Sequence, residues 1–290
     1  MSGMGGEVAH YWRHPALPDV GLLRARYVTH RFSRHVHDGY AIGVILHGVE
    51  EFEHPGGVER AGRGAVVAVN PGTVHTGQAG EPDGWAYRMT YPSVAVLAEI
   101  AAELGLPRGT PAFPSPVLDD PDAARRLRAV HRAGERGDAL AASTMLRTAY
   151  AALLRRHAAR YPAAGAQAAP PALPRVVRDA RDLLHARLVD PPALEELAAA
   201  VGARPFPLLR AFREATGLPP HAYLNQARVR AAAALLDEGL RPGEVAARTG
   251  FADQAHLTRH FKRTMGVPPG AYRAARGFGS VGSRETREEG

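Results

Sequence analysis

The 290-residue sequence predicts an α+β fold: an N-terminal β-barrel or jelly roll with trailing helices, then a C-terminal all-α domain. Two observations predict it. Between residues 20 and 90, short β-branched, aliphatic and aromatic runs alternate with Gly, Pro, Asp and His, as is typical of small barrels and double-sheet jelly rolls. After residue 93, apolar residues recur at three- and four-residue spacing, which indicates helices.

The clearest strands are two almost uninterrupted apolar runs, Ala41–Leu46 and Gly64–Val69. Turn signals separate the β-rich runs and fall at Asp38-Gly39, His47-Gly48, Pro55-Gly56-Gly57 and Pro71-Gly72. Many short strands punctuated in this way close most simply into a barrel or a jelly roll.

Three helices are expected between residues 93 and 160. The first ends near Gly105, the second covers 123–130 after Asp122 as its N-cap, and the third covers about 138–160. The third carries an apolar stripe at four- and three-residue spacing, formed by Ala142, Leu146, Ala149 and Leu153. Such a stripe fits either a dimerisation helix or a helix that packs on its own barrel.

The C-terminal part contains one motif twice. Residues 196–223 and 244–272 match with an offset of 48 residues up to a central glycine and of 49 after it. The matched pairs include Gly202 with Gly250, Arg210 with Arg259, Phe212 with Phe261 and Gly217 with Gly266. Each copy reads as a short helix, a glycine turn and a second helix, which is the helix-turn-helix arrangement that enters a DNA major groove. For one copy alone, an amphipathic hairpin in a helical core is the alternative.

Between the copies, residues 221–237 read as one helix, whose expected buried stripe is Leu224, Ala227, Ala231 and Leu235. At 1.5 Å per residue this helix spans roughly 25 Å. Successive major-groove faces lie ~34 Å apart, so the helix is suited to hold two recognition helices against adjacent grooves.

Charge and composition favour a nucleic-acid-binding protein and exclude several other classes of site. Of the net charge of +7, residues 175–276 contribute +6, as phosphate neutralisation by the repeated helices requires. The chain has no cysteine, which excludes disulfides and thiolate metal sites. No run approaches the ~20 apolar residues of a membrane span, and the first residues lack a signal-peptide core, so we expect a cytoplasmic protein without membrane contact.

Residues 175–276 resemble the DNA-binding domain of the AraC/XylS family of bacterial transcription regulators. The segment GFADQAHLTRHFKR, followed by GVPPGAYR, carries the resemblance. It implies double-stranded promoter DNA and RNA polymerase as partners, and a homodimer through the helix at 138–160. The expected division is an effector-binding and dimerisation domain at 1–160, a linker at 161–174, the DNA-binding domain at 175–276 and a disordered tail at 277–290.

The resemblance also implies which side chains touch DNA. By motif position, the base readers are Phe206, Leu209 and Arg210 in the first copy and Gln254, His256 and Arg259 in the second. Arg can hold guanine through O6 and N7, and Gln can pair with adenine. We expect Lys262 and Arg263 to contact phosphate, which positions the protein without reading sequence.

The first copy departs from the family pattern. Arg204 stands where a capping Ser or Thr is usual, and Pro205 and Pro207 remove N–H groups that could bind phosphate. Leu209 offers at most a contact with a thymine methyl group. We therefore expect the second copy to supply most of the base discrimination and the first to contribute mainly Arg210.

Two motifs in the β-rich part resemble those of the cupin barrel, the effector domain of many AraC-type regulators. They are His35-Val36-His37 followed by Gly48, and Gly64 leading to Asn70-Pro71-Gly72-Thr73-Val74-His75. The resemblance implies a small-molecule effector inside the barrel. The candidate pocket residues are His35, His37, Tyr40, His75, Trp85, Tyr87 and Arg88, with ordinary barrel packing as the alternative for the isolated aromatic residues.

His35, His37 and His75 occupy the positions of the three histidine ligands in metal-binding cupins. The glutamate expected three or four residues beyond His37-Asp38 is missing, because Ala41 and Ile42 stand there. We therefore expect an organic effector, no metal or other cofactor, and no enzymatic activity. A metal-dependent cupin enzyme and a constitutive DNA-binding protein are the alternatives. The sequence leaves activation and repression equally open.

Overall fold

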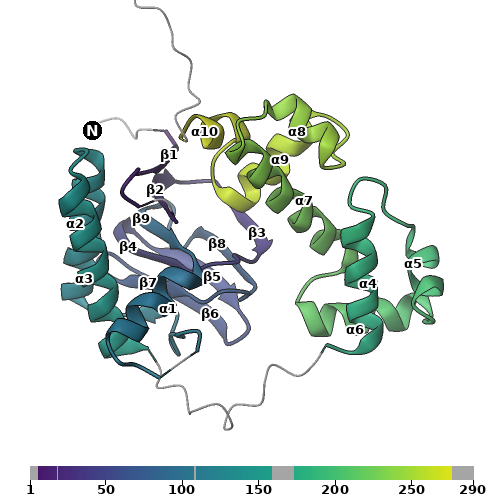
Figure 1. Ribbon diagram of the computed structural model, residues 1–290, viewed down its shortest axis with the longest axis horizontal. Coiled ribbons are helices and arrows are strands. Elements are labelled where there is room, and N and C mark those ends of the chain that lie inside the picture. The colour runs from purple at the N-terminus through teal and green to yellow at the C-terminus, as the bar shows by residue number, and fades with distance from the viewer. Residues whose placement is uncertain (1–5, 18, 108, 159–172, 276–290) are drawn as a thin grey trace, which may run out of the picture.

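The computed structural model describes residues 6–17, 19–107, 109–158 and 173–275. Strands occupy the first part of the chain, and the last part is entirely helical within the described residues (Figure 1). The predicted α+β fold class is therefore confirmed. Most of the predicted linker and all of the predicted tail lie outside the described residues.

The strands form two antiparallel sheets that face each other. The six-stranded sheet has the order β1 (Val8–Arg13), β2 (Val20–Tyr27), β9 (Trp85–Pro92), β4 (Ala41–Gly48), β7 (Val66–Val69) and β10 (Val117–Leu118). The four-stranded sheet has the order β3 (Phe32–His35), β8 (His75–Ala79), β5 (Glu50–His54) and β6 (Gly57–Ala61). Both apolar runs that the sequence singles out are central strands, β4 and β7.

Side chains of the six-stranded sheet alternate between an inner and an outer core, as the two-residue period of a strand requires. On β9, Tyr87 and Met89 point toward the second sheet and belong to the inner core. Their neighbour Thr90 points outward, where its hydroxyl donates to the Ile42 carbonyl oxygen and accepts from Tyr150. This alternation decides which predicted pocket residues reach the barrel interior.

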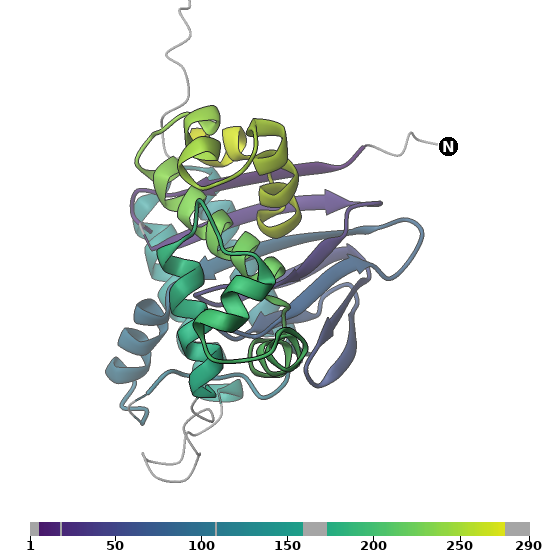
Figure 2. The same ribbon diagram turned by 90° about the vertical axis from the view of Figure 1, so that its right-hand side faces the viewer.

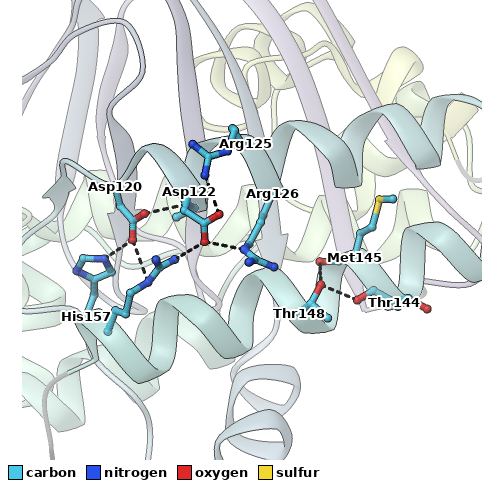
Figure 3. Close-up of polar contacts among 10 residues, drawn as sticks. Asp120, Asp122, Arg125, Arg126, Thr144, Met145, Thr148 and His157 are labelled. Atoms are coloured by element: carbon cyan, nitrogen blue, oxygen red, sulfur yellow. Dashed lines mark hydrogen bonds and ion pairs between the residues drawn. The ribbon is translucent and has the colours of Figure 1, made fainter.

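Three helices cover the outer face of the six-stranded sheet: α1 (Val94–Glu103), α2 (Pro121–Glu135) and α3 (Ala139–His157) (Figure 1). The predicted N-cap of α2 is wrong by two residues. Asp120, not Asp122, accepts the Ala123 amide at 2.9 Å, because Pro121 already occupies the first helical turn. Asp122 instead forms ion pairs with Arg125 and Arg126 (Figure 3).

The apolar stripe of α3 packs within its own chain. Leu146 is 4% exposed, and the other three stripe residues are completely buried in the outer core. The stripe therefore cannot itself form a dimer interface, which corrects its predicted role. The exposed apolar residues of α3 lie elsewhere on the helix, at Leu140 and Met145.

The helical part runs α4 (Arg175–Ala186), α5 (Leu194–Ala200), α6 (Pro205–Thr216), α7 (Pro220–Asp237), α8 (Pro242–Arg248), α9 (Gln254–Met265) and α10 (Pro269–Arg273). We call α5 with α6 the first unit and α8 with α9 the second unit. The repeat is real in three dimensions: α6 and α9 both have 12 residues, and Gly217 and Gly266 end them at φ 74° and 76°.

Helix α7 joins the two units, and the helices of this part stand along one side of the sheets (Figures 1 and 2). Its buried surface differs from the predicted stripe, because Ala231 and Leu235 are only partly buried whereas Val229, Ala232 and Leu236 are at most 1% exposed. The reason is that α7 packs against both units and the barrel, so one amphipathic face does not describe it.

The inner core of the barrel continues into the second unit. One cluster of buried residues contains Tyr27 and Trp85 of the barrel together with Leu257 and Phe261 of α9. The first unit has a separate core with α4 and the start of α7, and the partly buried Val74 is the barrel residue packed against it. The barrel therefore holds the second unit much more extensively than the first.

Candidate nucleic-acid interface and barrel chamber

The residues of helix α9 itself determine where it begins and which of its faces is buried. The Asp253 carboxylate accepts the His256 amide at 2.6 Å, which confirms the predicted N-cap. Leu257 and Phe261, four residues apart, are completely buried. The remaining surface of α9 is polar and basic.

The basic side chains of α9 are available to a ligand. Arg259, Lys262 and Arg263 are exposed. Within the described part of the chain, no side-chain hydrogen bond or ion pair engages any of the three, although most arginines of the barrel are paired. Exposed, unpaired cations on a recognition helix are suited to phosphates and base edges.

His256 is the one half-buried residue among the predicted base readers of α9. Its Nδ1 accepts the Ala252 amide at 3.4 Å, so in the neutral ring the proton resides on Nε2. Gln254 is exposed at the start of the helix. Burial lowers the pKa of the neighbouring His260, and His256 and the nearby arginines lower it further.

Helix α6 presents a different surface. Phe206 is 81% exposed, Arg210 is exposed and Leu209 is partly buried. Arg204 makes no side-chain capping bond, and Pro205 occupies the first turn, as the sequence predicts. Neither Arg210 nor Arg259 is hidden in packing, so both remain free to reach DNA.

The barrel interior contains a small chamber of about 30 Å³. We call it the chamber, and its polar lining residues are His35, His37, Glu50, His75, Thr76, Tyr87, Tyr91 and Thr264. His35 and His75 are cross-strand partners on β3 and β8, so both side chains enter the chamber from the same sheet. Thr264 comes from α9, so the second unit forms part of the chamber wall.

The three chamber histidines are held close together and uncharged. Their ring centroids are 4.3 Å apart for His35 and His75, 4.8 Å for His35 and His37, and 5.2 Å for His37 and His75. Burial lowers the pKa of all three, that of His37 to about 3. Burial likewise raises the pKa of the Glu50 carboxyl to about 8.

A second cavity, the cleft, has a volume of about 380 Å³ and lies between the barrel and the second unit. Its walls include Tyr11, Arg13 and Tyr91 from the barrel, Arg230 and Asp237 from α7, and Met265 from α9. His37, Tyr91 and Thr264 line both the cleft and the chamber, so the two spaces adjoin.

Two family models match this chain, one over each part. An AraC-like ligand binding domain matches residues 17–150, and a helix-turn-helix domain matches residues 197–275. The chain belongs to the AraC/XylS family of transcription regulators. It is thus a DNA-binding regulator with a ligand-binding domain, as the motifs of the sequence indicate.

Individual proteins similar to this AraC-type regulator are also transcription regulators. It is 25% identical over 239 residues to YbfI, an HTH-type transcriptional regulator of Bacillus subtilis (strain 168), with 82% of this chain and 86% of that protein covered. It is 37% identical to the regulator MtrA of Neisseria gonorrhoeae over 84 residues, which cover 28% of this chain and 27% of MtrA. The fold is similar to that of fatty acid-bound ToxT from Vibrio cholerae strain SCE256, with a TM-score of 0.51, 12% identity, and 94% and 97% of the two chains covered.

The structure brings only some of the predicted pocket residues of the regulator together. His35, His37, His75 and Tyr87 line the chamber. Arg88 faces the opposite side of β9, where its guanidinium donates to Glu135 of α2 at 2.9 and 3.1 Å. Strand alternation explains this placement, because Arg88 follows the inward-facing Tyr87.

Tyr40 and Trp85 are packing residues more than pocket residues. The Tyr40 ring belongs to the outer core, and its hydroxyl donates to the Pro111 carbonyl oxygen. Trp85 is 1% exposed and packs beside Tyr27, at a centroid distance of 5.3 Å, away from the chamber lining.

Sequence reasoning missed several residues of the chamber wall, among them Glu50, Tyr91 and Thr264. Glu50 and Tyr91 follow from strand alternation once the faces of β5 and β9 are known, but the sequence motifs do not include them. Thr264 has no local signal, because it reaches the chamber through the packing of α9 on the barrel. Among the described residues, no helix combines the length and the apolar character needed to cross a bilayer.

Proposed function

We propose that this regulator reads promoter DNA with α6 and α9 and that an organic effector, bound at the barrel, changes how the second unit meets the DNA. In this proposal Arg259, Gln254 and His256 read bases, Arg210 and Phe206 contribute from α6, and Lys262 and Arg263 contact phosphates. The single observation that carries the control mechanism is the shared core of the barrel and the second unit.

The cleft is the better place for an organic effector. Its volume of about 380 Å³ falls in the range of ligand pockets, ~300–1,000 Å³, whereas the chamber of about 30 Å³ does not. The related ToxT has been solved with an unsaturated fatty acid bound. An effector in the cleft would touch the barrel, α7 and α9 at once, and it controls DNA binding only if it favours one of two arrangements of these elements.

Further parts of the proposal concern assembly. In this proposal, residues 1–160 form the effector-binding and dimerisation domain, 161–174 the linker, 175–276 the DNA-binding domain and 277–290 the tail. The regulator acts as a homodimer that also contacts RNA polymerase. The exposed Leu140 and Met145 of α3 support a dimer surface there, in place of the buried stripe. That the matched relatives are regulators supports a chain without catalytic activity of its own.

Mapping the bound sites genome-wide, followed by fluorescence anisotropy on a mapped site and on a scrambled duplex, tests DNA reading. Specific binding at least ~10³-fold tighter than binding to the scrambled duplex is expected. Equal affinity for both duplexes would remove sequence-specific regulation from consideration.

The effector step is tested separately by a thermal-shift screen with fatty acids and aromatic acids. A compound that raises the melting temperature should also change the affinity for the mapped site. If stabilising compounds leave the DNA affinity unchanged, the barrel does not control DNA binding through this cleft.

A further inference from the structure

We infer that Arg228, in the middle of α7, is a positioning residue that fixes the two helix-turn-helix units relative to each other. Arg228 thereby sets the distance between the two DNA subsites that the regulator accepts in one complex. This effect on DNA rests on the proposed function, in which both α6 and α9 read bases. The fixed arrangement of the two units is a property of the protein alone.

The two units have separate apolar cores, and α7 joins them. Leu188, between α4 and α5, packs against the core of the first unit. Phe251, just before α9, is buried in the core that the second unit shares with the barrel. One connecting helix fixes how far apart the units lie along its axis. The rotation of each unit about that axis depends on side-chain contacts where the two cores meet.

Arg228 lies where the two cores meet and contacts both sides. Its Nε donates to the Leu188 carbonyl oxygen at 2.9 Å, and its Nη2 donates to the Val189 carbonyl oxygen at 3.3 Å. On the other side, the guanidinium carbon lies 6.0 Å from the centre of the Phe251 ring, which is within the range of a cation–π contact. One planar group therefore holds the loop before α5 and the turn before α9.

The burial of Arg228 indicates that its geometry matters more than its charge. The residue is 9% exposed, and burial lowers the pKa of its guanidinium. Its acceptors at this position are carbonyl oxygens, not carboxylates. A buried cation with neutral partners is costly, so an apolar side chain would fill the space at lower cost. Arginine adds a rigid fork of donors, which fixes the angle between the groups that it contacts.

The two turn glycines of the repeat differ at this junction. A Cβ added to Gly250 would lie 2.8 Å from both Arg228 Nη2 and the Val189 Cα. The equivalent Gly202 of the first copy has nothing within 4 Å of an added Cβ. Both glycines have positive φ angles, 78° and 68°, so both turns require glycine for the backbone. Only Gly250 is also required for the close approach of the two units.

The junction continues toward the candidate base readers of α9. The Phe251 ring lies 5.3 Å from the His256 ring and 5.8 Å from the His260 ring, measured between centroids. Arg228 itself is buried and contacts no surface that would meet DNA. It therefore acts on base reading through Phe251 and through the orientation of the whole second unit.

A rigid pair of units accepts one spacing of DNA subsites. B-DNA turns once in 10–10.5 base pairs, or about 34–36 Å, so one inserted base pair separates the subsites by roughly 3.4 Å more and rotates them by about 35°. Units held at one angle cannot follow this rotation, and we expect a loss of affinity of about tenfold or more. Units joined by α7 alone would adjust, as modules on a flexible connection do.

A distance measurement without DNA tests the fixed arrangement. The chain has no cysteine, so spin labels can be attached at Ala199→Cys and Ala247→Cys alone. These exposed positions on α5 and α8 are equivalent in the repeat, 48 residues apart. Electron paramagnetic resonance should give a narrow distance distribution in the otherwise unchanged protein. Arg228→Lys, which keeps the charge but loses the fork, and Gly250→Ala should both broaden it.

Two variants are matched controls for this measurement. Arg248→Lys makes the same chemical change at an exposed position on α8, and Gly202→Ala introduces the same backbone strain in the other turn. Both should keep the narrow distribution. Circular dichroism and melting of each variant establish that it is folded.

Fluorescence anisotropy tests the effect on DNA, with the mapped site and with the same site carrying one or two base pairs inserted at its centre. The wild-type protein and Arg248→Lys should lose about tenfold or more on insertion. Arg228→Lys should bind the original site more weakly and lose only about threefold or less on insertion. A residue that merely stabilises the fold would change overall affinity but not this ratio.

The inference is overturned if folded Arg228→Lys keeps the narrow distance distribution, or if it keeps the wild-type loss on insertion. Equal binding of the mapped and the scrambled duplex by the wild-type protein would instead refute the proposed reading of DNA. The distance measurement does not depend on that result, so the two failures are distinguishable.

Discussion

The hydroxyl of Tyr27, on β2 of the barrel, donates a 2.8 Å hydrogen bond to the carbonyl oxygen of Gly266, the residue that ends α9. The two residues are in such close contact that a Cβ at Gly266 would lie 2.5 Å from this hydroxyl. Close by, the Tyr11 and Tyr272 rings stack at 4.9 Å. The C-terminal end of the recognition helix is thus fixed to the ligand-binding domain.

Tyr27→Phe should loosen this attachment. The Gly266 carbonyl would lose a buried donor, and we expect a cost of about 1–3 kcal/mol in the free energy of unfolding. Hydrogen exchange of the α9 and α10 amides should accelerate. Tyr150→Phe removes a buried hydroxyl bonded to Thr90, on the far side of the barrel, and should destabilise the fold without this local acceleration. Equal exchange in both variants would contradict the role of Tyr27.

Arg259→Ala should cost about 1–3 kcal/mol on the cognate site and relax the preference at one base pair, because a bidentate arginine–guanine contact is lost. Anisotropy titrations against single-base variants of the site measure this. Arg248→Ala is the control, since Arg248 is exposed on α8 and pairs with Glu244 at 2.8 Å. Identical losses on specific and random DNA would show that Arg259 does not read a base.

Lys262→Ala should weaken binding to all duplexes similarly and reduce the slope of log K against log salt by about 0.9. The reason is that one phosphate contact fewer releases one counterion fewer. Titrations at several salt concentrations on specific and random duplexes provide the slopes. A loss confined to the specific site would assign Lys262 to base reading.

His131→Leu should make the protein less sensitive to acid. His131 is completely buried, and burial followed by repulsion from Arg88 lowers its pKa to about 3. Between pH 6.5 and 3 the unfolded chain therefore binds a proton that the folded chain does not. The folded state loses about 1.4 kcal/mol per pH unit in this window.

Denaturant unfolding of wild type and His131→Leu at pH 7.5 and 5 measures this effect. The variant should gain about 2 kcal/mol relative to wild type over this interval, most of it below pH 6.5. His47→Leu, at an exposed position on β4, should show no such gain. A pH-independent difference would mean that His131 binds its proton over the same pH range in the folded protein as in the unfolded chain.

The repeat was predictable because its signals are local. Asp253, Gly217 and Gly266 each act within one helical turn, and the structure places them at the predicted helix ends. The buried stripe of α7 was not predictable, because that helix packs on several sides. Periodicity describes one buried face and fails where a helix has more than one.

The pocket was predictable only in part for a similar reason. The spacing of His35 and His37 fixes them to one face, but no spacing states that Arg88 is paired with Glu135, 47 residues away. The attachment of α9 to the barrel joins residues 239 positions apart, Tyr27 and Gly266. Such contacts depend on packing between domains, which has no periodic signature in either segment.

The separation of the two helical cores has a consequence for sequence divergence. In the proposed mode of DNA reading, helix α9 satisfies two demands at once, because one surface would contact DNA while its C-terminal end forms part of the chamber wall. Helix α6 shares no such core with the barrel. Under the same proposal, substitutions in α6 would therefore change promoter preference without disturbing the barrel. The proline-rich start of α6 is an example of this freedom. The proposed function therefore implies that new target genes are acquired most easily by changes in the first unit.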